Sequence, residues 1–238
     1  MHPCPSYAIL ERKIPGFSRL RCLSMIVKLI QVDVMPDLAE RFSAGQQAWQ
    51  ALTGVEGFRG QTGGWAFDNP SRAIIVGLWR DRACYEHFMT DVHDGVLAAS
   101  GQKGTYGSSD VSLWNRVLDV PGRFENMPSA VDDGLFLRIA LCRLKPDRRE
   151  HFIEAQKTVW NPGMASAGGM QAGVFCESSL SSDRYMVCTL WGSETDHRHY
   201  REGPFHDLRR RAEVEVDCES VLGLLATVEP SWRVPPRS

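Results

Sequence analysis

The chain has 238 residues, of which 43% are hydrophobic and 24% charged, a composition typical of a folded protein and not of a disordered one. Its 27 basic and 29 acidic residues give a formal charge of −2, so no basic excess points to nucleic acid. No uninterrupted apolar run approaches the ~20 residues that a membrane helix needs. We therefore expect neither a nucleic acid nor a membrane as partner.

The cysteines indicate compartment and metal content. Seven are scattered along the chain and none forms a C-x-x-C pair, so we expect no structural zinc site and no other metal site. The odd count and irregular spacing suit reduced thiols, which favours a cytoplasmic protein.

Residues 1–24 differ from the rest, with four basic residues against one acidic residue. They lack the apolar stretch and the cleavage site of a secretory signal. Met25 stands directly before a strand-like run over 26–32. We expect the ordered fold to begin at Met25, so that 1–24 form a flexible N-terminal extension or reflect an upstream start assigned in error.

In the first half, a β-rich run over 26–34 is followed by Pro36-Asp37, which can open a helix. A Gly-rich second strand then ends at Trp65, and a polar turn over 68–71 predicts a hairpin into a third strand over 73–79. A shorter second helix ends near His93, and a fourth strand lies near 111–117.

The second half repeats this order, with strands at 135–144, up to Phe175, at 184–191 and at 221–228. Its first helix opens at Pro146-Asp147, its turn lies at 178–183 and its second helix ends near His206. Matched pairs in the same order tie the halves together. They are Phe42/Phe152, Gln46/Gln156, Trp49/Trp160, Gln61/Gln171, Trp65/Phe175, Gly77-Leu78-Trp79/Thr189-Leu190-Trp191, His87-Phe88/His199-Tyr200 and His93-Asp94/His206-Asp207.

The order βαββαβ in each half predicts an α+β fold of two fused ferredoxin-like units. The first unit spans 25–119, a linker spans 120–134, the second unit spans 135–230 and a tail spans 231–238. One such unit leaves a sheet face bare, and two in one chain can cover each other. We therefore predict an intramolecular dimeric α+β barrel, a pseudo-dimer that covers itself, and leave further homodimerisation open.

Three segments carry a family resemblance: 58–65 (FRGQTGGW), Phe88 through Asp94, and 104–106 (GTY). They resemble the YdbC-like family, within the antibiotic-biosynthesis-monooxygenase-like superfamily of dimeric α+β barrels. That superfamily includes cofactor-free monooxygenases, heme-degrading monooxygenases, chlorite dismutase-like heme proteins and stress-response barrels. The resemblance therefore implies the fold and leaves the function open.

We expect a pocket between the sheet and the helices of each unit. Glutamine and histidine supply hydrogen bonds there and tryptophan supplies flat walls, a mixture that suits an aromatic or planar small molecule. The predicted catalytic residues are His93 and Gln61. The predicted substrate-binding residues are Gln46, Gln47, Trp49 and Trp65 in the first half, and Gln156, Trp160, Gln171 and His206 in the second.

Two of these residues also have structural interpretations. The glycines around Gln61 allow close approach of a ligand or of another backbone, and they also fit a β-bulge. His93 also fits the role of a cap on the second helix. Phe175 in place of tryptophan, and Gly203-Pro204 before Phe205-His206, indicate one functional pocket and one that is mainly scaffold.

The favoured function is a monooxygenase-like oxidation without a cofactor, with neutral His93 as base and with Gln61 and Gln46 holding an oxyanion. The first alternative is a non-catalytic ligand-binding or stress-response barrel. The second is a heme-binding or heme-degrading protein with His93 or His206 as the axial ligand.

Overall fold

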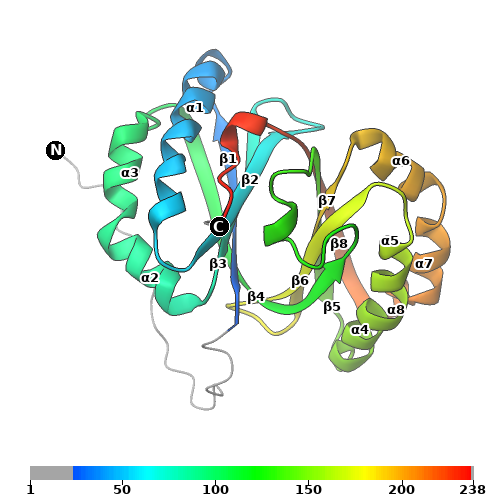
Figure 1. The fold of residues 1–238 in the computed structure, drawn as a ribbon. Helices are drawn as coiled ribbons and strands as arrows, with labels where there is room; N and C mark the ends of the chain where they lie inside the picture. Colours follow the sequence, from blue (N-terminus) through cyan, green and yellow to red (C-terminus); the bar gives the residue numbers. More distant parts are fainter. Residues whose placement is uncertain (1–23, 237–238) are drawn as a thin grey trace.

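The strands of residues 24–236, the part of the chain that this computed structural model describes, close into a barrel in the order β1-β3-β2-β8-β5-β7-β6-β4 (Figure 1). Four strands come from each half of the chain. The helices lie outside the barrel, on two opposite sides. Except for Ser24, the extension predicted over 1–24 lies outside the described residues.

The first half follows the predicted βαββαβ order. Its elements are β1 (Ile26–Val34), the 3-10 turn η2 (Pro36–Leu38), α1 (Ala39–Gln46), the 3-10 helix η3 (Gln47–Gly54), β2 (Phe58–Ala66), β3 (Arg72–Trp79), α2 (Arg82–Asp91), α3 (His93–Ser100) and β4 (Tyr106–Pro121). Asp81 begins α2 by accepting a hydrogen bond from the backbone N–H of Cys84 at 2.8 Å. Gly101, at φ +64°, ends α3.

The second half repeats the order with more broken helices. The linker carries the 3-10 turn η4 (Pro128–Ala130). Then follow β5 (Phe136–Leu144), α4 (Arg149–Ala155), the π-helical turn η5 (Gln156–Trp160), α5 (Asn161–Ala165), β6 (Met170–Ser178), β7 (Arg184–Trp191), α6 (Glu194–Glu202), α7 (Phe205–Arg211), α8 (Val214–Asp217), β8 (Cys218–Val228) and η6 (Pro230–Trp232). Within residues 24–236, no helix combines the length and the hydropathy that crossing a bilayer demands.

The second helix of the first half ends at Asp91, near His93 as predicted, whereas that of the second half ends at Glu202, before His206. In both halves a further helix, which was not predicted, follows it. His93 is the first residue of α3 rather than the last of α2, and His206 lies inside α7. Each second helix is followed by another because the chain turns and then continues helically, at Val92 and at Gly203-Pro204.

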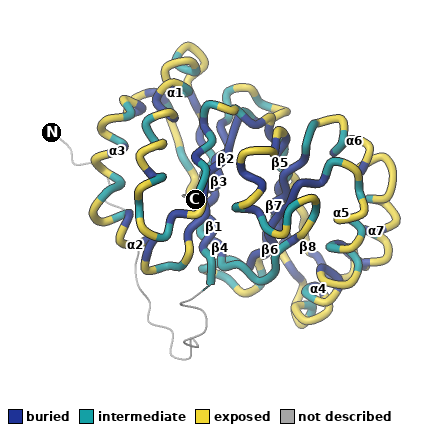
Figure 2. Tube along the Cα trace, in the orientation of Figure 1, coloured by how far each residue is buried: buried dark blue, intermediate teal, exposed yellow. Residues whose placement is uncertain are grey.

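The interior of the barrel is an apolar core that both halves share. Alternation along the strands sends Val27 and Leu29 inward in the first half, and Leu137 and Ile139 in the second. The strands that carry these residues form the buried centre of Figure 2. The linker predicted over 120–134 contributes to this core as well, because Met127, Ala130 and Val131 are fully buried in it. Its first two residues belong to β4.

Two seams join the halves: β2 pairs with β8, and β4 pairs with β6, both antiparallel. The first seam explains the double glycine of β2. A Cβ atom on Gly64 would lie 1.8 Å from the carbonyl oxygen of Thr227. The register also shifts between Phe58 and Gly60. Gly64 therefore allows the close approach of another backbone, one of the predicted roles, and the bulge lies at Gly60 and not at the Gly63-Gly64 pair.

The tail predicted over 231–238 is instead, as far as Pro236, an integral part of the first half. Trp232 is fully buried, with its ring centroid 5.7 Å from that of Phe42 and 5.1 Å from that of Trp65. Its indole N–H donates to Ser43 Oγ at 2.9 Å. Val234 pairs with the backbone of Gln61 through bonds of 2.8 and 3.0 Å. The chain thus returns from its second half to close the first.

This closure predicts a large effect of Trp232→Ala on stability. The substitution empties a fully buried site and removes the hydrogen bond to Ser43, so we expect it to lower the free energy of unfolding by about 3–5 kcal/mol. Denaturant unfolding followed by circular dichroism measures this. Leu222→Ala, at a leucine that is 56% exposed, is the control and should change the same quantity by less than about 0.5 kcal/mol. Equal effects of the two substitutions would contradict the packing described here.

Candidate functional site

A cavity of about 560 Å³ lies between the sheet and the helices of the first half. Strands β1, β2, β3 and β4 form its floor, and α1, η3, α2 and α3 form its roof. Aromatic rings make up much of its wall: Phe42, Trp49, Phe58, Trp79, Tyr85, Phe88 and Tyr106. A volume of this size accommodates a small organic molecule.

Four of the six residues predicted for the first half line this cavity: Gln46, Trp49, Gln61 and His93. The other two do not. Gln47 is exposed, because the 3-10 turn after α1 directs it to solvent. Trp65 is not part of the cavity wall and packs instead against Trp232 and Phe42, with ring centroids 5.1 and 6.0 Å away.

Gln46 places a buried side-chain amide in the cavity, and this amide makes no hydrogen bond within residues 24–236. It is the last residue of α1 and is almost fully buried. Its side chain makes no hydrogen bond with any other residue of 24–236, and it faces the cavity. An amide in this position offers both a donor and an acceptor to a ligand.

Gln102 holds Trp49 in place. The Trp49 indole N–H donates to Gln102 Oε1 at 3.0 Å, and Gln102 Nε2 donates to the carbonyl oxygen of Phe42 at 3.0 Å. Gln102 itself is buried and lines the cavity. Gln102 was not predicted from the sequence, because it sits in the loop after α3, where no periodic pattern marks it.

His93 stands between two aromatic rings at the edge of the cavity. Its ring centroid is 5.7 Å from that of Trp49 and 5.6 Å from that of Phe88, the latter edge to face. Nδ1 lies 2.9 Å from a carboxylate oxygen of the exposed Asp94. In the neutral imidazole an ionised Asp94 favours the proton on Nδ1, which leaves Nε2 as the basic nitrogen.

The backbone of Gln61 is held by strand pairing, whereas its side-chain amide makes only a weak hydrogen bond. Its backbone pairs with Val234, and its Nε2 lies 3.5 Å from the Trp232 carbonyl oxygen, at the outer limit of a hydrogen bond. Across the sheet Gln61 is opposite Gly77, and Gly77 is opposite Lys28. Because Gly77 has no side chain, the floor between Gln61 and Lys28 is open.

Lys28 is the principal residue of the site that the sequence analysis missed. It is only 8% exposed and lines the cavity floor. Burial lowers the pKa of its ammonium group from 10.5 to about 8. A signal was present in the sequence. Along Ile26, Lys28, Ile30 and Val32, the lysine occupies a helix-facing position of an otherwise apolar alternation.

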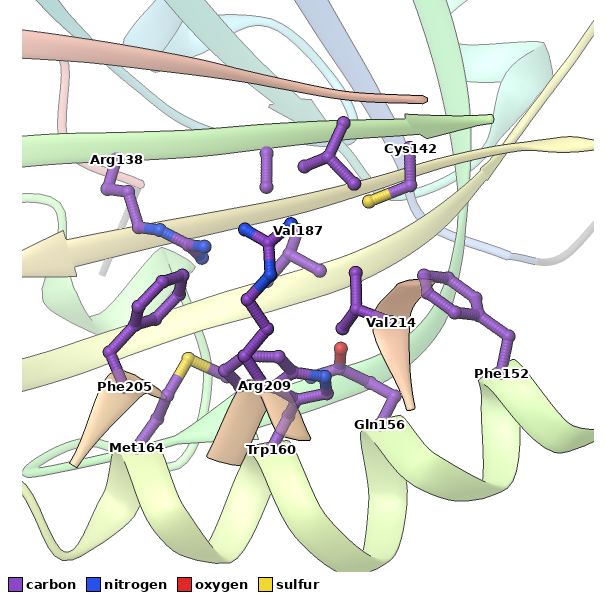
Figure 3. A pocket seen from close by; sticks show the side chains of 12 residues that line it. Arg138, Cys142, Phe152, Gln156, Trp160, Met164, Val187, Phe205, Arg209 and Val214 are labelled. Atoms are coloured by element: carbon purple, nitrogen blue, oxygen red, sulfur yellow. The ribbon is translucent and has the colours of Figure 1, made fainter. Parts of the chain in front are cut away.

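The corresponding cavity of the second half measures only about 40 Å³ (Figure 3). Of the predicted residues there, Gln156 and Trp160 line it, and Gln156 Nε2 is occupied by Asn161 Oδ1 at 2.7 Å. Large side chains fill the space around them. Those that Figure 3 labels include Arg138, Met164, Phe205 and Arg209.

The remaining second-half predictions fall outside this cavity. His206 is exposed on α7, and its neighbour Phe205 faces the cavity in its place. Gln171 is buried and donates to the carbonyl oxygen of Gly169 at 3.1 Å. Phe175 stacks on Tyr185 in the core. Of the two histidines considered as axial heme ligands, only His93 therefore lines a cavity. Within 24–236, no three His, Cys, Asp or Glu side chains form a cluster fit for a metal ion.

Comparison with known proteins places the first half in a family. Residues 26–114 match the model described as domain of unknown function (DUF4937). Uncharacterized protein YdbC of Bacillus subtilis (strain 168) is 35% identical over 92 residues, which cover 38% of this chain and 77% of YdbC.

Solved structures resemble the whole barrel. A candidate monooxygenase of Lactobacillus acidophilus NCFM has a TM-score of 0.69 at 12% identity, with 90% of this chain and 97% of that chain covered. An anthrone oxidase-like protein has a TM-score of 0.62 at 14% identity, with 87% and 92% covered. At these identities the likeness shows the fold.

The burial of Lys28 predicts a gain in stability on Lys28→Met. A pKa that falls from 10.5 to about 8 corresponds to about 3 kcal/mol of stability lost at neutral pH, which the uncharged side chain restores. Between pH 8 and 10.5 the unfolded chain binds a proton that the folded chain has released. The unfolding free energy of the parent protein should therefore rise across this window relative to that of the variant.

Denaturant unfolding of both proteins from about pH 7 to 10 measures this difference. Lys157→Met, at a lysine that is 66% exposed, should leave stability within about 0.5 kcal/mol. A Lys28→Met variant less stable than the parent at neutral pH would show that the buried charge is compensated in the folded protein.

Proposed function

We propose that the first half of this chain, which belongs to the YdbC-like family, binds a planar aromatic molecule and oxidises it with dioxygen, without a bound cofactor. The observation that carries the proposal is the difference between the two cavities. The first measures about 560 Å³ and has aromatic walls, amides and a histidine, whereas the second measures about 40 Å³. The monooxygenase-like and anthrone oxidase-like barrels support the reaction class.

The residues of the cavity suit proton removal from an acidic C–H or O–H group. His93 Nε2 acts as the base, and the amides of Gln61 and Gln46 donate hydrogen bonds to the oxyanion that forms. The substrate anion is then electron-rich enough to reduce dioxygen.

The stoichiometry of this oxidation is simplest when the substrate carries a benzylic methylene group next to a carbonyl-conjugated ring system. One methylene group and one molecule of dioxygen give one ketone and one molecule of water. The two C–H bonds of the methylene break and a C=O bond forms at the same carbon. The substrate supplies four electrons to dioxygen, one oxygen atom enters the product and the other leaves as water with both protons.

The rigidity of the cavity walls supports a planar substrate. Trp49 is held by Gln102, and Trp79 stacks on Phe88 with centroids 4.6 Å apart, so these rings do not turn freely. Fixed ring faces favour a flat apolar ligand, since stacking requires no reorganisation of the wall. We place this activity in the cytoplasm, with the chain acting on a small molecule and not on a macromolecule.

Anthrone is a suitable probe of the reaction. We expect the protein to raise oxygen uptake and anthraquinone formation above the spontaneous rate, with no cofactor added. His93→Gln should lower kcat/KM by about 10²-fold or more, because a general base contributes about 10²–10⁴-fold. An oxygen electrode and the absorbance of anthraquinone follow the consumption of dioxygen and the formation of the ketone independently.

His87→Gln provides the matched control. His87 lies on α2, is 61% exposed and pairs with Asp91 away from the cavity, so its loss should leave the rate unchanged. Saturable anthrone binding without oxygen uptake would refute the oxidation and leave the ligand-binding barrel. Uptake that is equally fast in His93→Gln would refute the role of the base.

Gly77→Thr tests the cavity itself. A Cβ atom at Gly77 would lie 3.8 Å from Trp79 Nε1 and 4.0 Å from Lys28 Cβ, both ordinary contacts, so the variant should fold. Its side chain would occupy the floor, and we expect anthrone affinity to fall by about tenfold or more. Quenching of tryptophan fluorescence measures this affinity. Gly223→Thr, at a β8 glycine with no neighbouring atom within 4 Å of a Cβ, should leave it unchanged.

A further inference from the structure

We propose that the ligand of the first-half cavity is an aromatic carboxylate, and that Lys28 binds its carboxylate group. The inference deepens the proposed function, because it rests on the same cavity and specifies the chemical class of its ligand. Its evidence is the set of contacts around Lys28, the absence of acidic residues from the described cavity wall and a comparison with the second half.

Lys28 is a buried cation without a counter-charge. Within 24–236, no carboxylate oxygen lies within salt-bridge distance of Nζ. Its polar contact is the Met89 thioether at 3.8 Å, which is a weak acceptor. Nζ also lies 5.6 Å from the ring centroid of Tyr85 and 5.9 Å from that of Phe88. Ring faces stabilise a cation only partly, so a buried ammonium in this setting lacks its usual partner.

The wall of the cavity contains no aspartate or glutamate among its described residues. The titratable side chains that face it are Lys28, Arg82, Tyr85, His93 and Tyr106. Arg82 is paired with Glu86 at 3.6 Å, and burial raises the pKa of Tyr85, which keeps that phenol neutral. The cavity is therefore positive at neutral pH, and an anionic ligand supplies the charge that Lys28 lacks.

A second donor stands beside the lysine. In the second half, Thr189 is opposite Arg138 across the sheet, and its hydroxyl accepts the Trp191 indole N–H at 3.1 Å. In the first half, the equivalent residue is Gly77, and no acceptor replaces the hydroxyl. The Trp79 indole N–H therefore has no hydrogen-bond partner within 24–236, and Trp79 lines the cavity. Over the bare Gly77, Lys28 and Trp79 can together donate to the two oxygens of one carboxylate.

The aromatic wall of the cavity favours an aromatic acid over an aliphatic one. The Phe88 ring lies 5.9 Å from Lys28 Nζ and 5.6 Å from the His93 ring, so the two groups flank one side chain. A fused bicyclic acid anchored at Lys28 is long enough to extend toward His93 along this wall. Arg138, the residue equivalent to Lys28, adjoins only about 40 Å³ of space, so the second half has no room for such a ligand.

The test compares two probes of equal size, 2-naphthoate and 2-naphthamide, by isothermal titration calorimetry on the full chain at neutral pH. We expect naphthoate to bind about tenfold or more tightly than the amide. Lys28→Met should remove that preference, while its retained affinity for naphthamide shows that the cavity is intact. Lys28→Arg keeps the charge and should retain the preference in part. Arg138→Met, the matched control in the second half, should change neither affinity.

Measuring naphthoate affinity as a function of pH distinguishes ligand binding by Lys28 from a purely structural role of this residue. Burial lowers the pKa of Lys28 to about 8, so naphthoate affinity should fall as the pH rises through this value and the amine loses its proton. Lys28→Arg stays charged throughout this range and should show no such fall. Naphthamide affinity should be flat in both proteins.

Each adverse outcome is distinct. Equal affinities for the two probes, unaffected by Lys28→Met, would overturn the inference and leave the proposed aromatic cavity standing. Decanoate binding as tightly as naphthoate would overturn the aromatic class of the acid. Failure of both naphthalene probes to bind at millimolar concentration would overturn the proposed function itself, together with the inference that rests on it.

Discussion

The structure depends on one constraint: each four-stranded sheet has helices on only one face, and its other face must be covered. The two halves meet this requirement by packing their bare faces together, with Val27 and Leu29 of one half against the layer that contains Leu137 and Ile139 of the other. Closure into a barrel also pairs the outer strands at two seams, so the sheet has few free edges. The linker adds Met127 to the same core.

Once one half covers the other, the helix-facing sides of the two sheets are free to diverge. In the second half this side is filled by long side chains and leaves about 40 Å³, whereas in the first half it encloses about 560 Å³. The exchange of Thr189 for Gly77 illustrates the difference. One position satisfies a tryptophan N–H and fills the floor, and the other leaves both the N–H and the floor to a ligand. The two halves of the duplicated fold thus differ in that one is filled on this side and the other is open.

Lys28 shows how a residue of such a site can oppose the stability of the folded chain. Burying an ammonium group with no carboxylate within salt-bridge distance opposes folding. A residue that opposes stability at the floor of a cavity is a reasonable candidate for function, because binding would relieve the unfavourable charge. His93 and the amides of Gln46 and Gln61 lie around the same cavity. The site therefore combines a lysine, a histidine and two amides on aromatic walls.

The sequence was sufficient to predict the strands, the repeat and hence the paired ferredoxin-like units, because alternation and turn residues are local signals. It also identified Gln46, Trp49, Gln61 and His93 as residues that face one cavity, since they fall at repeated positions on neighbouring elements. Tertiary structure alone decided which repeated positions are open. Trp65 packs against Trp232, a residue far along the chain, and does not line the cavity. His206 turns outward because α7 presents Phe205 to the cavity. Lys28, Gln102 and Trp232 matter through contacts that are distant in the chain, and no local pattern records the space that two distant segments leave between them.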